Sequence, residues 1–293
     1  IDTGGLVATT MSIRDSDFMS GIYSFERSGY GEVENAGIIT IRNGGYALLA
    51  ADKVTNAVTG TIDAAGGQVM LASAERVTID TNSDGLVGFS VSGNDIRQVA
   101  SVENAGLIAA DGGRIVLSAK GARELTGMVV NNTGVLRAQS IEEKDGVIIL
   151  GASSGATTNS GKLDTSSASG KGGTVQVLGE KVGLFDSSNI DVSGKTGGGT
   201  VLVGGDYQGK NQNIQNANYV VVGKNATINA NATENGDGGK VIVWSDDETR
   251  FFGAVNAQGG AVSGNGGFVE VSGKETLAFK GNVDTRAVNG NTG

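Results

Sequence analysis

The 293-residue sequence contains no cysteine, no proline and no histidine. Without cysteine the chain has no disulfides, no thiol chemistry and no cysteine-ligated zinc. Without histidine it has neither Ser-His-Asp nor Cys-His catalysis, and no histidine-ligated metal. Proline lacks the N–H group that a strand needs when it is hydrogen-bonded on both sides. A chain without proline is therefore suited to sheets in which every strand has two neighbours.

Positive charge is also scarce, because 22 Lys and Arg residues face 31 Asp and Glu residues, giving a net charge of −9. This balance argues against a nucleic-acid backbone as the partner. No apolar run approaches the roughly 20 residues of a membrane-spanning helix, and no signal segment stands at the start. The sequence begins and stops inside the repeat described next, so we expect it to be an internal piece of a longer protein.

Glycine is abundant, with 50 residues, and it introduces a phrase in which a turn precedes a strand with alternating apolar residues. The phrase reads GGYALLA at Gly44, GGQVMLA at Gly66, GGRIVLS at Gly112, DGVIILG at Asp145, GGTVQVL at Gly172, GGTVLVG at Gly198, GGKVIVW at Gly238 and GGFVEVS at Gly266. A second phrase precedes it, as GTIDA at Gly60, GLIAA at Gly106, GVLRA at Gly134, GKLDT at Gly161, NIDV at Asn189, TINA at Thr227 and GAVNA at Gly253. Uninterrupted, the pair recurs about every 22–28 residues, which predicts an all-β solenoid, a right-handed parallel β-helix.

Alternation within each strand predicts which side chains fill the interior, because successive side chains point to opposite faces. In the first phrase the inward pairs are Ala47/Leu49, Val69/Leu71, Ile115/Leu117, Ile148/Leu150, Val175/Val177, Val201/Val203, Val241/Val243 and Val269/Val271. In the second phrase they are Ile62/Ala64, Ile108/Ala110, Leu136/Ala138, Leu163/Thr165, Ile190/Val192, Ile228/Ala230 and Val255/Ala257. A large residue followed by a smaller one suits a narrow tube.

The outward positions are mixed in polarity. Gln68, Arg114, Thr174, Gln176, Lys240 and Glu270 suit water, whereas Leu48, Met70, Val116, Ile149, Leu202 and Ile242 would form an apolar stripe. The stripe reflects either strand propensity with cover from an excursion of the chain, which we favour, or a docking face for a partner. Residues 1–31, 81–100 (with Phe89) and 205–222 depart from the repeat and are candidates for such excursions. Dividing the length by the repeat gives about 12 coils and a rod of roughly 55–60 Å.

Two outward carboxylates offer the best case for chemistry. Asp164 and Asp191 occupy the same position in successive coils, where stacked carboxylates raise a pKa or bind Ca²⁺. The same position also holds Asp63, Ala109, Arg137, Asn229 and Asn256. This variety favours a hydrated polar position instead. We therefore assign no catalytic, cofactor-binding or metal-binding residue, expect no cofactor, and predict that the protein is not an enzyme.

The remaining candidates also have structural interpretations. GDGG at Gly236 and GNGG at Gly264 resemble calcium-binding repeats, but they are isolated and so favour simple turns. Asn35, Asn104 and Asn132 precede similar corners, where they would hydrogen-bond the turn or stack as an amide ladder. Trp244 should point outward, either as a carbohydrate platform or, as we favour, packed beneath the Phe251–Phe252 corner. Asn131, Asn225 and Asn231 begin N-x-T sequons, whose glycosylation the sequence leaves open.

Several phrases together resemble the filamentous-haemagglutinin-like exoproteins of two-partner secretion, especially the high-molecular-weight adhesin branch. They are GGLVATT at Gly4, DFMSG at Asp17, VENAGIIT at Val33, VENAGLIAADGG at Val102, GGDYQGK at Gly204, GDGGKVIVWSDDETRFFG at Gly236 and GNGGFVEVSGKETLAFKG at Gly264. The family's NPNG-type turn, expected upstream of GGLVATT, is absent. The resemblance implies a protein secreted to the surface of a Gram-negative bacterium, exported unfolded through a POTRA-containing outer-membrane transporter.

The resemblance also implies an organisation. Residues 1–125 are similar to the C-terminal part of the secretion domain, and residues 126–293 to the proximal shaft of a secreted adhesin or haemagglutinin. Host-cell glycans or proteins are expected partners, through regions that lie partly or wholly beyond this sequence. Two alternatives stay open: the stalk of a contact-dependent polymorphic toxin, and a carbohydrate-active β-helix enzyme that uses Asp164 and Asp191.

Overall fold

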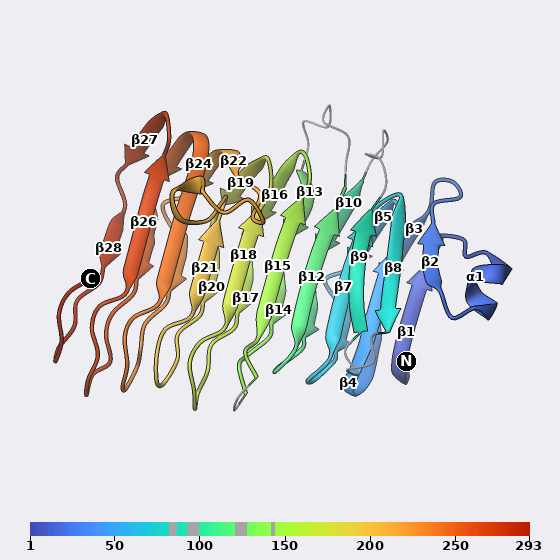
Figure 1. Cartoon of the computed structure of the whole chain (residues 1–293), viewed down its shortest axis with the longest axis horizontal. Coiled ribbons are helices and arrows are strands. Elements are labelled where there is room, and N and C mark those ends of the chain that lie inside the picture. The colour runs from blue at the N-terminus through green and yellow to red at the C-terminus, as the bar shows by residue number, and fades with distance from the viewer. Residues whose placement is uncertain (82–86, 93–99, 121–127, 142–143) are drawn as a thin grey trace.

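The chain folds into a rod of stacked coils, with its first and last residues at opposite ends (Figure 1). This computed structural model describes residues 1–81, 87–92, 100–120, 128–141 and 144–293, and for residues 81, 87–89 and 128 it describes only the backbone. Among the described residues, 25 strands form one sheet that winds around the rod, and each strand pairs in parallel with the strand one coil away. The predicted all-β parallel β-helix is confirmed.

Each coil contributes one strand to each of three faces. The first face contains β1 (Asp2–Thr9), the end of β4 (Ile38–Ala50), β7 (Gln68–Ser73), β12 (Arg114–Ala119), β15 (Val147–Ala152), β18 (Thr174–Leu178), β21 (Thr200–Val203), the start of β24 (Lys240–Phe251) and β26 (Phe268–Gly273). The second face contains β3 (Glu32–Asn35), β5 (Lys53–Asn56), β10 (Ser101–Asn104), β13 (Met128–Asn132), β16 (Ala156–Asn159), β19 (Lys181–Leu184), β22 (Ala217–Val222), the end of β24 and β27 (Thr276–Phe279). The third face contains the start of β4, β6 (Thr61–Asp63), β11 (Leu107–Ala109), β14 (Val135–Arg137), β17 (Lys162–Asp164), β20 (Asn189–Asp191), β23 (Thr227–Asn229), β25 (Ala254–Asn256) and β28 (Asn282–Asp284).

The register of the first face confirms the coil length. Tyr46 pairs with Gln68, 22 residues later, and Lys240 pairs with Phe268, 28 residues later. Glycine is required where the coils meet at a corner, because a Cβ atom on Gly113 would lie only 2.0 Å from the carbonyl oxygen of Gly67. The glycine pairs therefore allow backbones to stack at a spacing that no side chain permits.

The interior is filled as the alternation predicted. One apolar cluster runs through the rod, and it includes Leu49, Ile115 and Val241 from the first face and Ile62 and Ile228 from the third. The last inward pair, Val269 and Val271, is half-buried and packs against the same cluster. The interior positions were thus readable from period-two alternation alone.

The number of coils was overestimated. The described ladder of the first face has nine strands, from β1 to β26, so the rod is about 38 Å long at the usual strand spacing. The difference from about 12 coils arises because residues outside the repeat form excursions. Dividing the whole length by the repeat counted those residues as coils.

Two excursions lie against the outside of the first face (Figure 1). At the N-terminal end, β2 (Tyr23–Glu26), β8 (Arg76–Thr81) and β9 (Val87–Ser92) form a three-stranded antiparallel sheet, and the short helix α1 (Asp15–Met19) precedes β2. Near the C-terminal end, residues 204–216 form a loop that includes the single-turn helix η1 (Tyr207–Gly209). Residues 1–31, 81–100 and 205–222 were the regions predicted to depart from the repeat. This prediction is correct only in part, because Asp2–Thr9 and Ala217–Val222 belong to the ladder, and residues 82–86 and 93–99 lie outside the described residues.

The predicted boundary between residues 125 and 126 lies outside the described residues. On either side of it, β10 pairs with β13 and β12 pairs with β15, so the same ladder continues past this point. The division into a secretion domain and a shaft stays a prediction about function.

Candidate functional site

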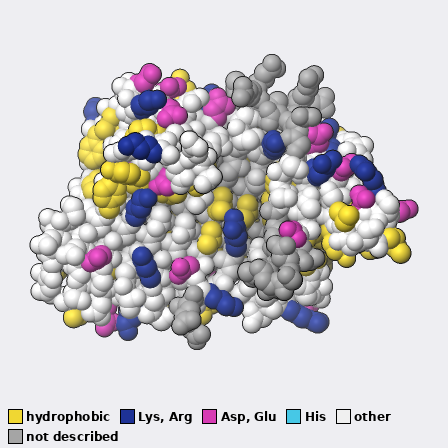
Figure 2. Space-filling view, viewed as in Figure 1, with side chains coloured by type: hydrophobic (Ala, Val, Ile, Leu, Met, Phe, Trp, Pro, Cys, Tyr) yellow, Lys and Arg dark blue, Asp and Glu magenta, His cyan; other side chains and the backbone are white. Residues whose placement is uncertain are grey.

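The outward apolar stripe forms one column on the first face, because Leu48, Met70, Val116, Ile149, Gln176, Leu202 and Ile242 pair successively from coil to coil. Leu48 and Ile242 are fully buried, and Met70 and Leu202 are nearly so. Cover by excursions therefore explains both ends of the stripe. Val116 and Ile149 are half-buried in the gap between the covers, where Figure 2 shows apolar side chains in the middle of the rod.

The three-stranded sheet covers the N-terminal end of the stripe. Val77 and Ile79 of β8 pack against Leu48 and Met70 in a second apolar cluster. The chain is held in place where it leaves β2, because the Arg27 guanidinium forms an ion pair with the buried carboxylate of Asp52. This cover is a small sandwich of two sheets held by apolar contact.

The loop at residues 204–216 covers the C-terminal end of the stripe with polar contacts. The Asp206 carboxylate accepts hydrogen bonds from Asn211 Nδ2 at 2.8 Å, Lys240 Nζ at 2.8 Å and the Tyr207 N–H at 2.7 Å. Although partial burial opposes ionisation, these three hydrogen bonds hold the pKa of Asp206 at about 2. The loop is therefore fastened by a carboxylate that stays ionised in moderately acidic solution.

Trp244 lies beneath this loop. Its side chain is 9% exposed and packs with Leu202, Ile242 and Ile214, and its Nε1 donates a hydrogen bond to Asp246 Oδ1 at 3.1 Å. The prediction that Trp244 points outward is correct, but the predicted cover is wrong. The loop covers it, whereas Phe251 lies in the interior and stacks on Phe279, with ring centroids 5.4 Å apart.

Asp164 and Asp191 are brought together as predicted, since they pair in adjacent strands of the third face. Each carboxylate, however, has its own local partners. Asp164 is buried and accepts hydrogen bonds from Lys162 Nζ at 2.8 Å and Ser166 Oγ at 2.7 Å. Asp191 accepts one from Ser193 Oγ at 2.6 Å. Although burial opposes it, the bonds from Lys162 and Ser166 lower the pKa of Asp164. The lowered pKa keeps this carboxylate charged, the opposite of what a general acid requires.

The predicted amide ladder is present and longer than expected. Along the second face, side-chain Nδ2–H groups donate from Asn35 to Asn56, from Asn56 to Asn104, from Asn104 to Asn132 and from Asn132 to Asn159, at 2.7–2.9 Å. The pattern identified three of these residues. Asn56 and Asn159 were missed. Two more residues separate Asn56 from the following glycine than at the other corners, whereas Asn159 has the same spacing to Gly161 as the three identified residues have to their glycines.

The glycine-rich turns and the sequons take ordinary surface positions. At the GDGG turn, Asp237 Oδ1 accepts a hydrogen bond from the Asn265 N–H at 2.7 Å, so it serves the stacking of turns. In the part of the chain that the structure describes, no cluster of three or more acidic side chains is placed to hold a metal. Of the sequon asparagines, Asn225 is exposed, whereas Asn131 and Asn231 are half-buried and accept hydrogen bonds.

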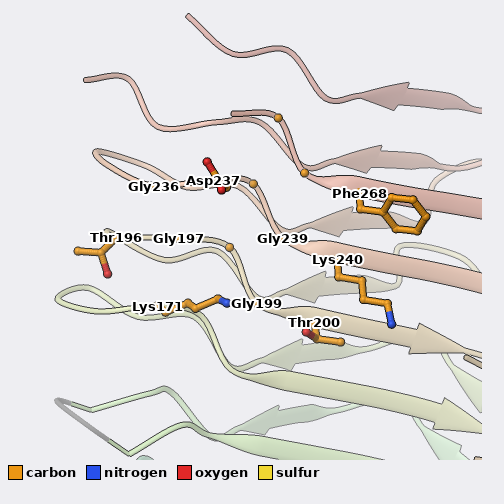
Figure 3. Close-up of a pocket in the computed structure, with 14 residues that line it drawn as sticks. Lys171, Thr196, Gly197, Gly199, Thr200, Gly236, Asp237, Gly239, Lys240 and Phe268 are labelled. Atoms are coloured by element: carbon orange, nitrogen blue, oxygen red, sulfur yellow. The ribbon is translucent and has the colours of Figure 1, made fainter. Parts of the chain in front are cut away.

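A trough that the sequence reasoning missed runs along the corner before the first face (Figure 3). Its floor is made of the glycine pairs at the corners, and it encloses about 590 Å³. One side carries Lys171, Thr196 and Asp237 from the loops, and the other carries Thr200, Lys240 and Phe268 from the strand starts. The glycine pairs signalled the floor, but only the folded loops bring the two rows together.

Comparison with solved structures gave a match that covers nearly the whole chain. No family model matches the sequence, and no curated protein matches it. The fold is similar to the crystal structure of the HMW1 secretion domain from Haemophilus influenzae, with a TM-score of 0.84 and 31% sequence identity. The alignment covers 98% of this chain and 74% of that one.

This similarity extends to sequence as well as fold, and it agrees with the phrases quoted above. The matched protein is a secretion domain. Within the described residues, no helix is long and apolar enough to cross a membrane. The chain belongs to the HMW1-like, filamentous-haemagglutinin-type family of two-partner secretion adhesins.

Proposed function

We propose that the chain forms the end of the secretion domain and the proximal shaft of a large adhesin, exported unfolded to the bacterial surface. The match to a secretion domain over 98% of the chain supports the role in secretion. The parallel ladder that runs from β1 to β26 supports the role as a shaft. The working part is the rod itself, which holds a distal binding region away from the cell. Residues 1–125 belong to the secretion domain in this proposal, and residues 126–293 to the shaft.

The architecture supports export in an unfolded form followed by folding outside. Each strand of a coil is hydrogen-bonded to the coils directly before and after it, as β18 is to β15 and β21. A coil can therefore fold on the coil that emerged before it, without waiting for the rest of the chain. The sequence has no cysteine, so no disulfide can close a loop in the oxidising periplasm before passage.

The partner for export in this proposal is a POTRA-containing outer-membrane transporter. The match supports such a partner because the solved protein is itself a secretion domain. Host-cell glycans or proteins are further partners of the whole adhesin. The purified periplasmic domain of the transporter should bind the unfolded chain. Failure to bind would contradict the proposal that this transporter is the export partner.

Export in an unfolded form is tested by an engineered disulfide, Ser153→Cys with Ser263→Cys, in the full-length protein. Both serines are exposed, and four ladder steps separate β15 from β26, about 19 Å. A disulfide needs Cα atoms within about 7 Å. The pair can therefore close only in a chain that has not folded. We expect the oxidised loop to block secretion, and reductant to restore it.

Each single cysteine variant is the matched control and should be secreted normally. The secreted protein is measured in the culture medium, and the disulfide on non-reducing gels of the periplasmic fraction. Normal secretion of protein that carries the disulfide would contradict export in an unfolded form. It would not contradict the β-helix architecture. Loss of secretion in the single variants would show that the substitutions themselves are harmful.

A further inference from the structure

The trough offers a second function for the rod, independent of export. It extends from Lys171, before β18, to Phe268 at the start of β26, three ladder steps or about 14 Å. Its volume of about 590 Å³ lies in the range of ligand-binding pockets. It is elongated along the rod axis and therefore fits an extended ligand rather than a compact one.

The backbone of the floor is already fully engaged where the glycine pairs stack. The N–H of Gly198 donates to the Asp237 carbonyl at 3.0 Å, and the N–H of Gly238 donates to the Asn265 carbonyl at 2.9 Å. The second glycine of each pair, Gly199 or Gly239, donates back into its own coil. These four glycines offer an extended peptide no free N–H donor, so β-strand addition at the glycine pairs is disfavoured. A ligand must instead be held by the side chains along the two rows.

An exposed aromatic pair closes one end of the trough. Phe268 is 50% exposed and Tyr207 is 44% exposed, and their rings meet edge to face with centroids 5.5 Å apart. Along the sides, Thr196, Thr200 and Asp237 offer hydroxyl and carboxylate oxygens to the solvent. Flat apolar faces joined to hydroxyl groups characterise one class of ligand, the oligosaccharides, whose rings stack on aromatic side chains while their hydroxyls bond to polar ones.

The two lysines in the trough differ in their pairing. Lys240 Nζ contacts Asp206 at 2.8 Å, whereas Lys171 forms no ion pair within the described part of the chain. The Lys171 side chain extends along the floor beside Gly197 and Gly199 (Figure 3). An ammonium group without an ion-pair partner can form a charge-assisted hydrogen bond with an anionic group of a ligand.

We propose that the trough binds an extended acidic oligosaccharide, with a sugar carboxylate on Lys171 and a ring face on Phe268. The net charge of −9 repels polyanions from the rest of the surface. Binding therefore depends on this local site and weakens as salt screens the contact with Lys171. The proposal does not rest on the mode of export and concerns the folded rod.

The test uses the purified 293-residue chain with tetragalacturonate, its methyl ester and a hyaluronan tetrasaccharide. Affinity is measured by calorimetry, and the site by NMR shifts of the floor glycines. We expect an acidic probe to bind and shift Gly198, Gly199, Gly238 and Gly239. Lys171→Ala should weaken acidic probes about tenfold without changing the weaker binding of the methyl ester. Phe268→Ala should weaken both kinds of probe.

Matched controls remove the same side chains elsewhere on the rod. Lys224 is exposed at the turn before β23, and Phe185 is 41% exposed at the end of β19. Lys224→Ala and Phe185→Ala should leave binding unchanged, and thermal unfolding of every variant excludes misfolding as a cause. The proposal is overturned if neither acidic probe binds at millimolar concentration, if the shifts lie outside the trough, or if Lys171→Ala behaves like Lys224→Ala.

Discussion

The two covers on the first face bury the same column of outward side chains by different means. At the N-terminal end, Leu48 and Met70 lie under β8, whose Val77 and Ile79 supply an apolar surface of their own. At the C-terminal end, Leu202 and Ile242 lie under a loop that adds only Ile214 to the apolar cluster. One cover is a second sheet, and the other is a loop fastened by hydrogen bonds and charge.

The difference shows how a solenoid tolerates apolar residues outside its interior. A covering sheet removes apolar area from water on both partners, so its stability scales with the area buried. The covering loop buries little apolar area of its own and depends on links such as Asp206 with Lys240, and the Gln208 N–H with Glu270 Oε2 at 3.1 Å. We expect the loop to open more easily than the sheet, and to respond to pH.

The largest effects should come from placing a charge under each cover. Met70→Asp buries a carboxylate between two sheets, and we expect a loss of about 4 kcal/mol in the free energy of unfolding. Ile242→Asp should cost only about 2 kcal/mol, because the loop can lift and let water reach the carboxylate. Denaturant midpoints give the stabilities, and the fluorescence of Trp244 reports the lifted loop.

Val241→Asp is the reference for this comparison, because Val241 faces the interior of the rod where no cover can open. It should cost at least as much as Met70→Asp. If Ile242→Asp and Val241→Asp lowered the midpoint equally, the loop would be as firmly packed as the interior. The distinction between the two covers would then be wrong.

An intermediate effect should follow from acid. Because the folded-state pKa of Asp206 is about 2, below its ordinary 3.8, the stability it adds is complete above about pH 4. This stability is lost as the pH falls toward 2. The pair is partly hydrated, so we expect a loss of about 1 kcal/mol. Trp244 fluorescence should shift over this range, while the amide protons of Val77 and Ile79 stay protected from exchange.

Asp206→Asn is the matched variant for the acid experiment. It should show the shifted Trp244 fluorescence already at neutral pH and little further change between pH 4 and 2. Equal loss of protection at Val77 and Ile79 over the same range would mean that both covers depend on carboxylates.

The smallest expected change in unfolding free energy comes from a substitution in the interior of the rod. The Thr165 hydroxyl is buried and has no hydrogen-bond partner among the described residues. Thr165→Val replaces this hydroxyl with a methyl group of similar size, and the corresponding interior residue of the next coil is already Val192. We expect a gain of about 1 kcal/mol in unfolding free energy, measured from the denaturant midpoint. An unchanged or lower midpoint would indicate that the hydroxyl is satisfied, for example by a buried water molecule.

Much of the rod could be predicted from the sequence because its interior is specified by local alternation. The inward pairs and the coil length of 22–28 residues were visible in short segments of chain. The departures from the repeat were predicted only in part, because Asp2–Thr9 and Ala217–Val222 belong to the ladder. Asn35, Asn104 and Asn132 were also identified, since the ladder repeats once per coil. The coil count was wrong because length alone does not separate coils from excursions.

The sequence by itself determined the interior, because neighbouring residues decide which way each strand side chain points. Only the tertiary structure decided what lies outside. Whether Ile242 or Trp244 meets water depends on a loop whose residues precede them by many positions in the sequence, and the repeat does not encode that contact. The same holds for the trough, whose two rows lie on either side of one corner and are built up from successive coils. Contacts between coils and excursions depend on distance in space, which a repeating pattern does not encode.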